Sequence, residues 1–211
     1  MQQGSAEWFA ARLGKVTASR VADVVAKTKS GPSASRKNYA AELILERLTG
    51  QATETFTSAA MQWGIDTEPQ ARAGYEFLTD STVETVGFID HPLIDMSGAS
   101  PDGLVGNDGL IEIKCPIPAT HLDTLRSGKV PERYITQMQW QMACTGRAWC
   151  DFVSFDPRFP ENLQMFRERI ERDADRIAEL EREVTIFLSE IAEAVRQLSR
   201  IGDEPNFMMA G

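Results

Sequence analysis

The spacing of apolar residues divides the chain into a helical first part, a strand-rich centre and a helical end. In the first 78 residues, apolar positions recur every three or four residues, which is the period of an amphipathic helix. The helices expected there cover about 5–13, 20–27, 35–48 and 57–78. Ser5 is a candidate N-cap of the first helix, and Thr17 or Ser19 of the second. An interruption of the fourth helix is expected near Gly64 and Pro69.

The centre of the chain alternates apolar and polar residues, which predicts strands. The strands are expected at 83–90, 103–105, 110–114 and 149–155, and helices between them at about 119–126 and 132–144. Beyond Pro160 the chain becomes rich in Glu and Arg and predicts one long helix, about 167–200, with Ile170 in its buried stripe. This order is typical of an α/β (α+β) fold whose central mixed sheet is flanked by helices. Residues 1–211 are expected to form one domain, since no repeat or long linker divides them.

Composition is that of an ordinary globular protein, with 42% apolar and 25% charged residues in 211. The sequence has no run of about 20 apolar residues, so no membrane span is expected. From residues 1–4, no signal peptide is expected. The three cysteines are odd in number and lack the spacing of metal ligands. These features predict a protein of the reducing cytoplasm.

The net charge of −9 bears on any interaction with nucleic acid. Neither residues 1–160 nor residues 161–211 are basic, which argues against tight binding of a polyanion by overall charge. A nuclease of this charge must gather its Lys and Arg locally, offset its carboxylates with a metal, or line a channel built from several subunits.

The segments Ser100–Gly103 and Glu112–Lys114 carry the most informative pattern. The strands at 103–105 and 110–114 flank a Gly-Asn-Asp-Gly turn, so they are expected to pair as a hairpin. Pairing brings Asp102 level with Glu112. Alternation along the second strand places Glu112 and Lys114 on one face and turns the isoleucines between them towards the core.

Two carboxylates and a lysine at one sheet edge suit a specific chemistry. A hard divalent cation binds one or two carboxylates together with substrate phosphates, and Lys114 adds a positive charge beside them. That set is what metal-assisted cleavage of a phosphodiester needs. The alternative is a surface hairpin with solvated charges. Because such short motifs also arise by chance, the pattern alone leaves both interpretations open.

Further segments extend the pattern over most of the chain. They are Trp8-x3-Arg12-Leu13-Gly14 with Thr17-Ala18-Ser19, Trp63-Gly64-x3-Glu68, Ser100–Leu104, Leu110–Pro116 and Tyr134-x2-Gln137-x-Gln139. In this order and spacing, the chain closely resembles the lambda-type phage exonucleases. These form the YqaJ-like viral recombinase family, within the Pro-Asp…Glu-x-Lys nuclease superfamily. The matched blocks run from Trp8 to about Pro157, and the C-terminal helix is the least matched part.

The resemblance implies a restriction-endonuclease-like core and a processive exonuclease dependent on Mg²⁺. Two Mg²⁺ ions are expected, and Mn²⁺ is expected to substitute. Such enzymes degrade the 5′-ended strand of linear double-stranded DNA to 5′-mononucleotides and leave a 3′ overhang for phage-type recombination. They work as homotrimer rings together with a single-strand annealing protein. The implied location is the cytoplasm of a bacterial host cell.

The resemblance also assigns the metal ligands. Asp102, Glu112 and the backbone carbonyl of Ile113 are expected to bind the first cation. Glu68 is expected to bind the second, and two metals together clamp the attacking and leaving oxygens of an in-line displacement. Without the resemblance, Glu68 is better interpreted as a solvated helix carboxylate.

Lys114 is expected to orient the attacking water and to stabilise charge on the phosphate. Gln137 and Gln139 stand two apart on a helix and therefore point in different directions. The resemblance favours Gln137 as the one that bonds the water or the phosphate, and leaves Gln139 structural. His91 and His121 lack ligand spacing and are interpreted as ordinary polar residues.

Arg12 and Ser19 are expected to hold the terminal 5′-phosphate of the DNA. Arg offers a planar fork for phosphate oxygens, and Ser19 is placed at a helix start, where free N–H groups favour an anion. On the residues alone, a surface arginine and an ordinary N-cap are the better interpretation. Further candidate contacts to the DNA backbone are Arg36, Lys37, Lys129 and Arg133, for each of which a solvated surface position is an equal alternative.

Two rival functions remain open from the sequence. One is an endonuclease or repair nuclease with the same core, which would not need a DNA end. The other is a DNA-end-binding protein that recruits an annealing protein and cleaves nothing. The complete set of Asp102, Glu112 and Lys114 argues against the second, because a binding module has no need of a metal site.

Overall fold

The computed structural model describes residues 1–29, 31–53 and 58–203. The helices are α1 (Ala6–Arg12), α2 (Val21–Val25), α3 (Ala34–Thr49), α4 (Ala59–Thr79), α5 (Pro118–Ser127), α6 (Glu132–Thr145) and α7 (Ala174–Asp203), with 3₁₀ helices at Ala18–Arg20 and Glu161–Leu163. The strands are β1 (Val16–Thr17), β2 (Lys27–Thr28), β3 (Gly31–Pro32), β4 (Val83–Glu84), β5 (Ile89–Asp90), β6 (Ser97–Ala99), β7 (Gly103–Val105), β8 (Gly109–Lys114), β9 (Trp149–Phe155) and β10 (Met165–Glu171).

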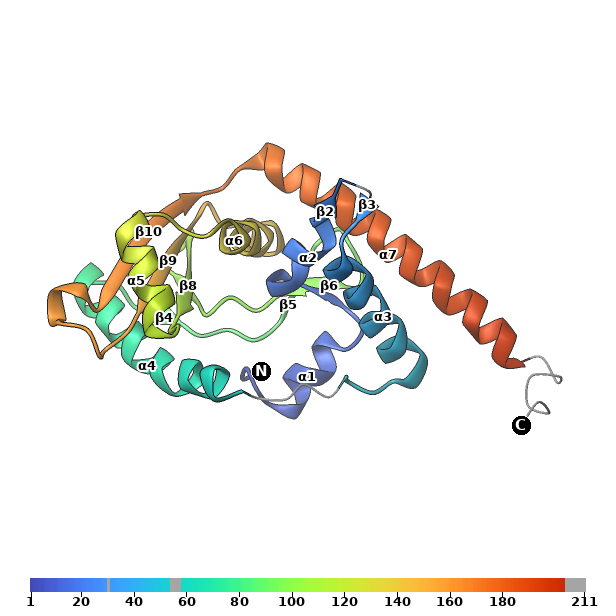
Figure 1. Cartoon of the computed structure of the whole chain (residues 1–211), viewed down its shortest axis with the longest axis horizontal. Helices are drawn as coiled ribbons and strands as arrows, with labels where there is room; N and C mark the ends of the chain where they lie inside the picture. Colours follow the sequence, from blue (N-terminus) through green and yellow to red (C-terminus); the bar gives the residue numbers. More distant parts are fainter. Residues whose placement is uncertain (30, 54–57, 204–211) are drawn as a thin grey trace.

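The main sheet has the strand order β10-β9-β8-β7-β4 and is mixed. Strands β8 and β9 run parallel, and the other neighbours run antiparallel. Helices α4 and α6 lie on opposite faces of this sheet (Figure 1). The predicted fold class, a mixed sheet flanked by helices with a long C-terminal helix, is confirmed.

The two faces of β8 explain how one short strand serves both core and site. Ile111 and Ile113 pack with Ala71 and Tyr75 of α4. Leu110 packs with residues of α6 on the other face. Side chains alternate along a strand, so Glu112 lies on the same face as Leu110 and is turned towards α6.

The predicted hairpin is formed by β7 and β8, with Gly103 opposite Ile111. Asp102 therefore stands opposite Glu112, as the alternation predicted. Gly103 is required at the next position, because a Cβ there would lie 2.2 Å from Cγ1 of Val83 on the neighbouring strand β4. The glycine that follows the aspartate thus allows the close approach of β4 to the hairpin.

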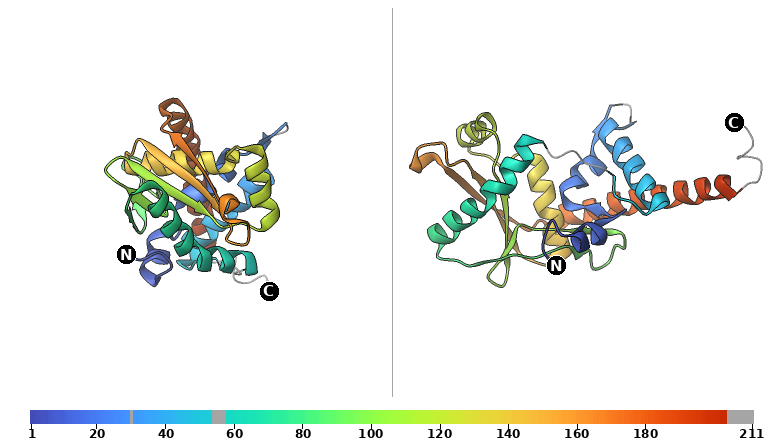
Figure 2. Two further views of the ribbon diagram at one scale, coloured as in Figure 1. Left: turned by 90° about the vertical axis from the view of Figure 1, so that its left-hand side faces the viewer. Right: turned by 90° about the horizontal axis from the view of Figure 1, so that it is seen from below.

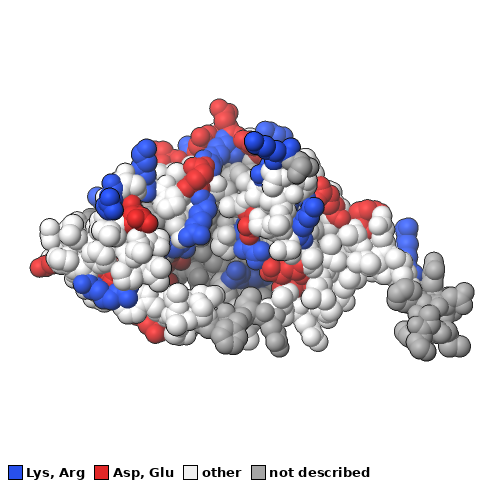
Figure 3. Space-filling view, viewed as in Figure 1, with Lys and Arg blue, Asp and Glu red and all other residues white. Residues whose placement is uncertain are grey.

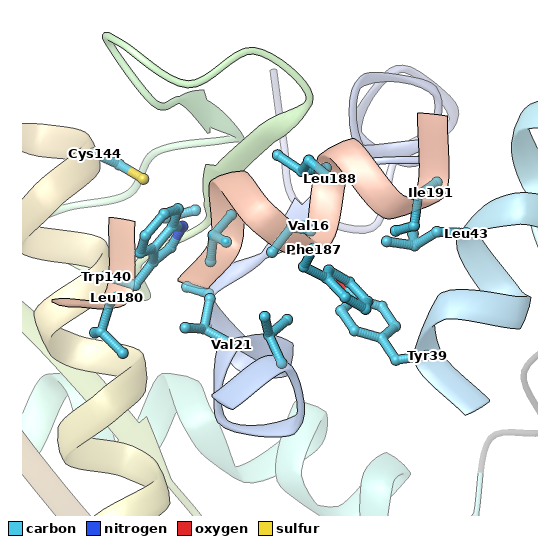
Figure 4. Close-up of a cluster of buried hydrophobic side chains, with 14 residues drawn as sticks. Val16, Val21, Tyr39, Leu43, Trp140, Cys144, Leu180, Phe187, Leu188 and Ile191 are labelled. Atoms are coloured by element: carbon cyan, nitrogen blue, oxygen red, sulfur yellow. The ribbon is translucent and has the colours of Figure 1, made fainter. Parts of the chain in front are cut away.

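A second core joins the N-terminal helices to α7. Tyr39 of α3 stacks on Phe187 of α7 with ring centroids 5.8 Å apart, and Leu43 and Ile191 pack beside them (Figure 4). Helix α7 then continues past the rest of the molecule (Figure 2). Between this core and the main sheet, the face seen in Figure 3 is hollowed near its centre, and Lys and Arg side chains gather around the hollow.

The prediction of a C-terminal helix over 167–200 was wrong at its start. Residues 165–171 form β10, which pairs antiparallel with β9, and the helix begins at Ala174. Ile170 consequently packs with the sheet and not with α7. The segment has the alternation of an edge strand, but its Glu and Arg residues are also good helix formers. Pairing with β9, a tertiary contact, decides the outcome.

Four shorter predictions also need correction. The strand expected at 83–90 is two short strands, β4 and β5, which belong to different sheets. The helix expected at 20–27 is α2, of only five residues, and Lys27–Thr28 pairs with β3 instead. Thr17 and Ser19 do not cap α2, whose N-cap position is Arg20. The helical period of the first 78 residues predicts a buried apolar stripe of Trp8, Phe9 and Leu13 for the first helix, but α1 buries no residue, and Phe9 is 52% exposed.

Helix α4 runs through Pro69 without the expected interruption. Pro69 removes one hydrogen bond, to the carbonyl four residues earlier. That residue, Ile65, lies on the exposed side of the helix, where solvent can take the place of the missing donor. Ser58 caps the helix by accepting from the N–H of Met61, and the predicted start at Thr57 lies outside the described residues.

None of the helices in the described part of the chain combines the length and hydropathy needed to cross a bilayer. The organisation of residues 1–211 as one domain stays a prediction.

Candidate active site

The two predicted acids come together at the β7–β8 hairpin. Oδ2 of Asp102 accepts a hydrogen bond from the backbone N–H of Ile113 at 2.6 Å. Asp102 is partly exposed, whereas Glu112, in the middle of β8, is fully buried. Both carboxylates line one cavity of about 200 Å³.

Glu112 accepts hydrogen bonds at both of its oxygens. Gln137 of α6 donates to Oε1 at 2.7 Å, and Gln141, one turn later, donates to Oε2 at 2.6 Å. Lys114 forms an ion pair with Oε1. Its ammonium also lies 5.2 Å from the ring centroid of Tyr134, within cation–π range. The predicted side chains Glu112, Lys114 and Gln137 are therefore in direct contact.

The charges of this cluster perturb one another. Burial, and then the nearby charge of Glu112, raise the pKa of Asp102 well above its ordinary value. Burial alone would lower the pKa of Lys114, but the carboxylates of Glu112 and Asp102 outweigh it, and the pKa lies above its usual range. Two carboxylates and the ammonium of Lys114 thus share this cavity.

Arg12 and Ser19 line the same cavity as Asp102, Glu112 and Lys114. The guanidinium of Arg12 stacks on the Trp8 ring at 3.8 Å, and burial lowers its pKa. Ser19 lies in the 3₁₀ helix before α2. It was expected at the start of a helix over about 20–27, but α2 behind it has only five residues, so a helix dipole contributes little there.

Glu68 lies beside this cavity. It lines a larger groove of about 1080 Å³, which Arg12, Ser19 and Asp102 also border. Arg72, one turn later on α4, donates to Oε1 of Glu68 at 2.5 Å. The charge of Glu68 is one of the causes that raise the pKa of Asp102. The predicted acid is therefore close to the hairpin but tied to an arginine of its own helix.

The donor set fits a hard divalent cation. Asp102 and Glu112 offer carboxylate oxygens beside the Ile113 backbone, and such cations take oxygen ligands. Both carboxylates line one cavity, so a positive charge placed between them would be favoured. Across residues 1–29, 31–53 and 58–203, no three Asp, Glu, His or Cys side chains converge into a complete metal cluster. A cation here would therefore draw further ligands from substrate and water, as Mg²⁺ usually does.

The polar residues of α6 separate into two groups. Gln139 donates to the carbonyl of Glu171 and accepts from the N–H of Asp173, so it ties α6 to the β10–α7 connection. Gln141 was not identified from the sequence. Its spacing of four from Gln137 is the signal that would have found it, because residues i and i+4 share a helix face.

The candidate contacts to the DNA backbone differ in their surroundings. Arg36 donates to the carbonyl of Val24 and to Glu190, which gives it a structural role. Arg133 donates to the hydroxyl of Tyr134, next to Lys114. His91 and His121 are buried and hydrogen-bonded within the core, away from the cavity lining.

Comparison with known proteins gives consistent matches. A profile of the YqaJ-like viral recombinase domain matches residues 7–148. LHK-Exo, an alkaline exonuclease from Laribacter hongkongensis with a known crystal structure, has 57% sequence identity with this chain. The match covers 94% of this chain and 98% of the LHK-Exo chain, and the two structures superpose with a TM-score of 0.88. The structure of LHK-Exo in complex with dAMP has the same identity and coverage and a TM-score of 0.89.

A phage-related exonuclease from Haemophilus somnus 129PT is 16% identical, covers 87% of this chain and 96% of its own, and has a TM-score of 0.69. At that identity the likeness concerns the fold alone. No curated protein sequence matches the chain.

Fold and relationship together place the chain in the class of exodeoxyribonucleases, as the sequence predicted. It belongs to the YqaJ-like viral recombinase family, since the profile covers most of its length and a 57%-identical relative covers nearly all of it. The resemblance drawn from the motif blocks is thereby confirmed.

Proposed function

We propose that the protein is a Mg²⁺-dependent exonuclease that degrades the 5′-ended strand of linear double-stranded DNA. The products are 5′-mononucleotides and a 3′ single-stranded overhang that serves phage-type recombination. The observation that carries this proposal is the shared cavity: Asp102, Glu112, Lys114 and Gln137 line it together with Arg12 and Ser19. In this proposal, the pair that recognises the phosphate stands beside the cleavage site.

The acidic residues would hold the cations. Asp102, Glu112 and the Ile113 carbonyl would bind the first Mg²⁺ and Glu68 the second, with Mn²⁺ as a substitute. When bound, such ions polarise the phosphate and lower the pKa of a water molecule. For Glu68 to bind a cation through Oε1, the cation has to replace Arg72 as the partner of that oxygen.

The remaining side chains position the reactants. The Lys114 ammonium, oriented by Glu112 and by the Tyr134 ring, orients the attacking water and offsets charge that builds up on the phosphate. Gln137 has an amide at the cavity wall that can bond the water or the phosphate. Glu112 holds both groups at the cavity, where the DNA strand would arrive.

Arg12 and Ser19 define the end of the strand in this proposal. The guanidinium provides a planar fork for the oxygens of a terminal phosphate, and its stacking on Trp8 fixes the plane of that fork. A 5′-phosphate held there limits how far the strand enters the cavity. That limit accounts for both the 5′ polarity and the release of one nucleotide at a time.

A protein with a net charge of −9 does not hold DNA by overall charge, so an enzyme that encircles the DNA is favoured. We infer a homotrimer ring around the duplex, which makes digestion processive without strong overall attraction, and a single-strand annealing protein as partner. The three cysteines are buried free thiols, in keeping with the cytoplasm of a bacterial host cell as the site of action.

Digestion of linear and circular duplexes, with Mg²⁺ and with EDTA, tests the proposal. The expected result is mononucleotide release from linear DNA only, and only with Mg²⁺. Cleavage of a covalently closed circle would favour the rival endonuclease. Binding of ends without release of nucleotides would favour the non-cleaving recruiter.

A further inference from the structure

Helix α6 holds both oxygens of one carboxylate. Gln137 donates to Oε1 of Glu112 at 2.7 Å and Gln141 donates to Oε2 at 2.6 Å. Their spacing of four residues places both amides on the face of α6 that meets the sheet. The orientation of Glu112 is therefore set by two amides from the same helix.

The two glutamines differ in their access to substrate. Gln137 lines the cavity, and the oxygen that it bonds is shared with Lys114. Gln141 is 0% exposed and does not border that cavity. Gln137 and Lys114 can thus exchange Glu112 for a phosphate or a water, whereas Gln141 stays out of reach of both.

The amide of Gln141 also has a defined orientation. Its Oε1 lies 3.9 Å from Sγ of Cys150, a buried thiol on β9 that serves as the donor. The carboxylate of Glu112 accepts hydrogen bonds and cannot donate them when ionised. The amide oxygen therefore faces the thiol and the amide nitrogen faces Glu112, an arrangement that α6 and β9 fix together.

We propose that Gln141 is the positioning residue that fixes Glu112 for cation binding. The inference rests on the proposed role of Glu112 as a cation ligand. Gln141 keeps the Glu112 carboxylate in place through Oε2, while Oε1 exchanges Gln137 and Lys114 for other partners. Loss of a hydrogen-bond partner behind a ligating carboxylate typically costs about 10–100-fold in metal affinity or activity.

Gln139 provides a matched control. It is a glutamine of the same helix, 2% exposed, and bonds only backbone groups of the β10–α7 connection. Gln141→Met and Gln139→Met each remove one buried amide and keep a similar volume. Both variants are expected to melt at lower temperature than the wild type, so the melting temperature does not separate the two roles.

Binding of Mn²⁺ separates them, and it is measured directly from the electron paramagnetic resonance signal of the free ion. Gln141→Met is expected to bind Mn²⁺ about 10–100-fold more weakly than the wild type, while Gln139→Met stays within about twofold. In steady-state digestion, Gln141→Met is expected to lower kcat with little change in the KM for DNA ends.

Equal Mn²⁺ affinities of Gln141→Met and the wild type would overturn the proposal, as would an equal loss in Gln139→Met. If Gln141→Met does not unfold cooperatively, the same criteria apply to Gln141→Asn, which keeps an amide but withdraws it by one methylene. A wild-type protein that binds Mn²⁺ but digests no linear duplex contradicts the proposed function alone. A digesting enzyme with unchanged Mn²⁺ binding in the variant contradicts this inference alone.

Discussion

Asp102 and Ile113 are joined across the β7–β8 hairpin by a hydrogen bond of 2.6 Å from the backbone N–H to Oδ2. The side chain of Asp102, directly before β7, thus accepts from a backbone N–H of β8. Because the hairpin register places Asp102 opposite Glu112, the separation of the two acids is set by the sheet and not by flexible side chains. The strands therefore set the geometry at which the proposed cation would bind.

Replacing Lys114 with Met should lower cleavage by about 100- to 1000-fold, the range seen when one donor that stabilises transition-state charge is removed. Affinity for DNA should change little, because Arg12 and the groove remain. Single-turnover digestion and a filter-binding assay measure the two effects. Lys27→Met removes an exposed ion pair with Glu183 and should leave the rate unchanged. A Lys114→Met enzyme with normal turnover would exclude the lysine from the mechanism.

Asp102→Asn should stabilise the protein in EDTA while it lowers activity. The amide can still accept from the Ile113 N–H, but it removes a negative charge whose burial and nearness to Glu112 raise the pKa of Asp102. Relief of about 1 kcal/mol would raise the melting temperature by about 2–4 °C in a chain of this size. Activity should fall by more than the roughly 100-fold that loss of an outer hydrogen-bond partner costs.

Calorimetry at pH 8 checks the stability of Asp102→Asn. The control is Asp108→Asn, in the exposed turn of the same hairpin, which should change neither property. A drop of several degrees in Asp102→Asn alone would show that the carboxylate serves the fold more than the reaction.

Arg12→Ala should abolish discrimination between 5′-phosphorylated and 5′-hydroxyl ends. Hydrogen bonds to charged groups contribute about 1.5–3 kcal/mol, so the wild type should favour the phosphorylated end by about 10- to 100-fold. Initial rates on duplexes treated or untreated with phosphatase give the ratio. Arg126→Ala, at an exposed position on α5, should retain the preference. Equal rates on both ends with the wild-type enzyme would rule out the pocket.

His91 should make the fold less stable in acid. Burial lowers its pKa more than Glu181, 3.3 Å away, raises it, and Nδ1 accepts from the N–H groups of Leu93 and Ile94. The unfolded chain binds a proton near pH 6.5 that the folded chain does not bind, so stability falls as the pH drops below that value.

The loss of melting temperature between pH 7.5 and 5.5 should consequently be smaller in His91→Gln than in the wild type. Glu181 contacts the His91 ring, and Trp140 stacks on the ring with the centroids 4.9 Å apart. Titratable groups that do not touch His91 should contribute equally to the pH dependence of both proteins. Identical pH dependences would show that His91 is not the responsible group.

The local part of the site could be predicted from the sequence. A turn between two alternating segments defines a hairpin register, and that register places Asp102 opposite Glu112. The meeting of Arg12 with Asp102 depends on segments far apart in the chain, so only the family resemblance suggested it. Gln141 was missed because α6 has the polar composition of a surface helix, although the fold buries it from Thr136 to Cys144.

The start of the last helix could not be predicted for a related reason. The Glu- and Arg-rich residues before Ala174 favour a helix by local propensity, and their alternation is short. The open edge of β9 provides a full row of backbone partners, with seven paired positions from Met165 to Glu171. Such long-range pairing overrides local preference and is not visible in the segment itself.

The direct test of the account is digestion, in the presence of Mg²⁺, of a linear duplex that carries 5′-phosphates and a radiolabel at one 5′ end. The account predicts that the label is released first, as a mononucleotide, and that Asp102→Asn and Lys114→Met release none on the same timescale. Label that stays on a long strand while nucleotides leave the 3′ end, or that is released as longer oligonucleotides, would contradict it.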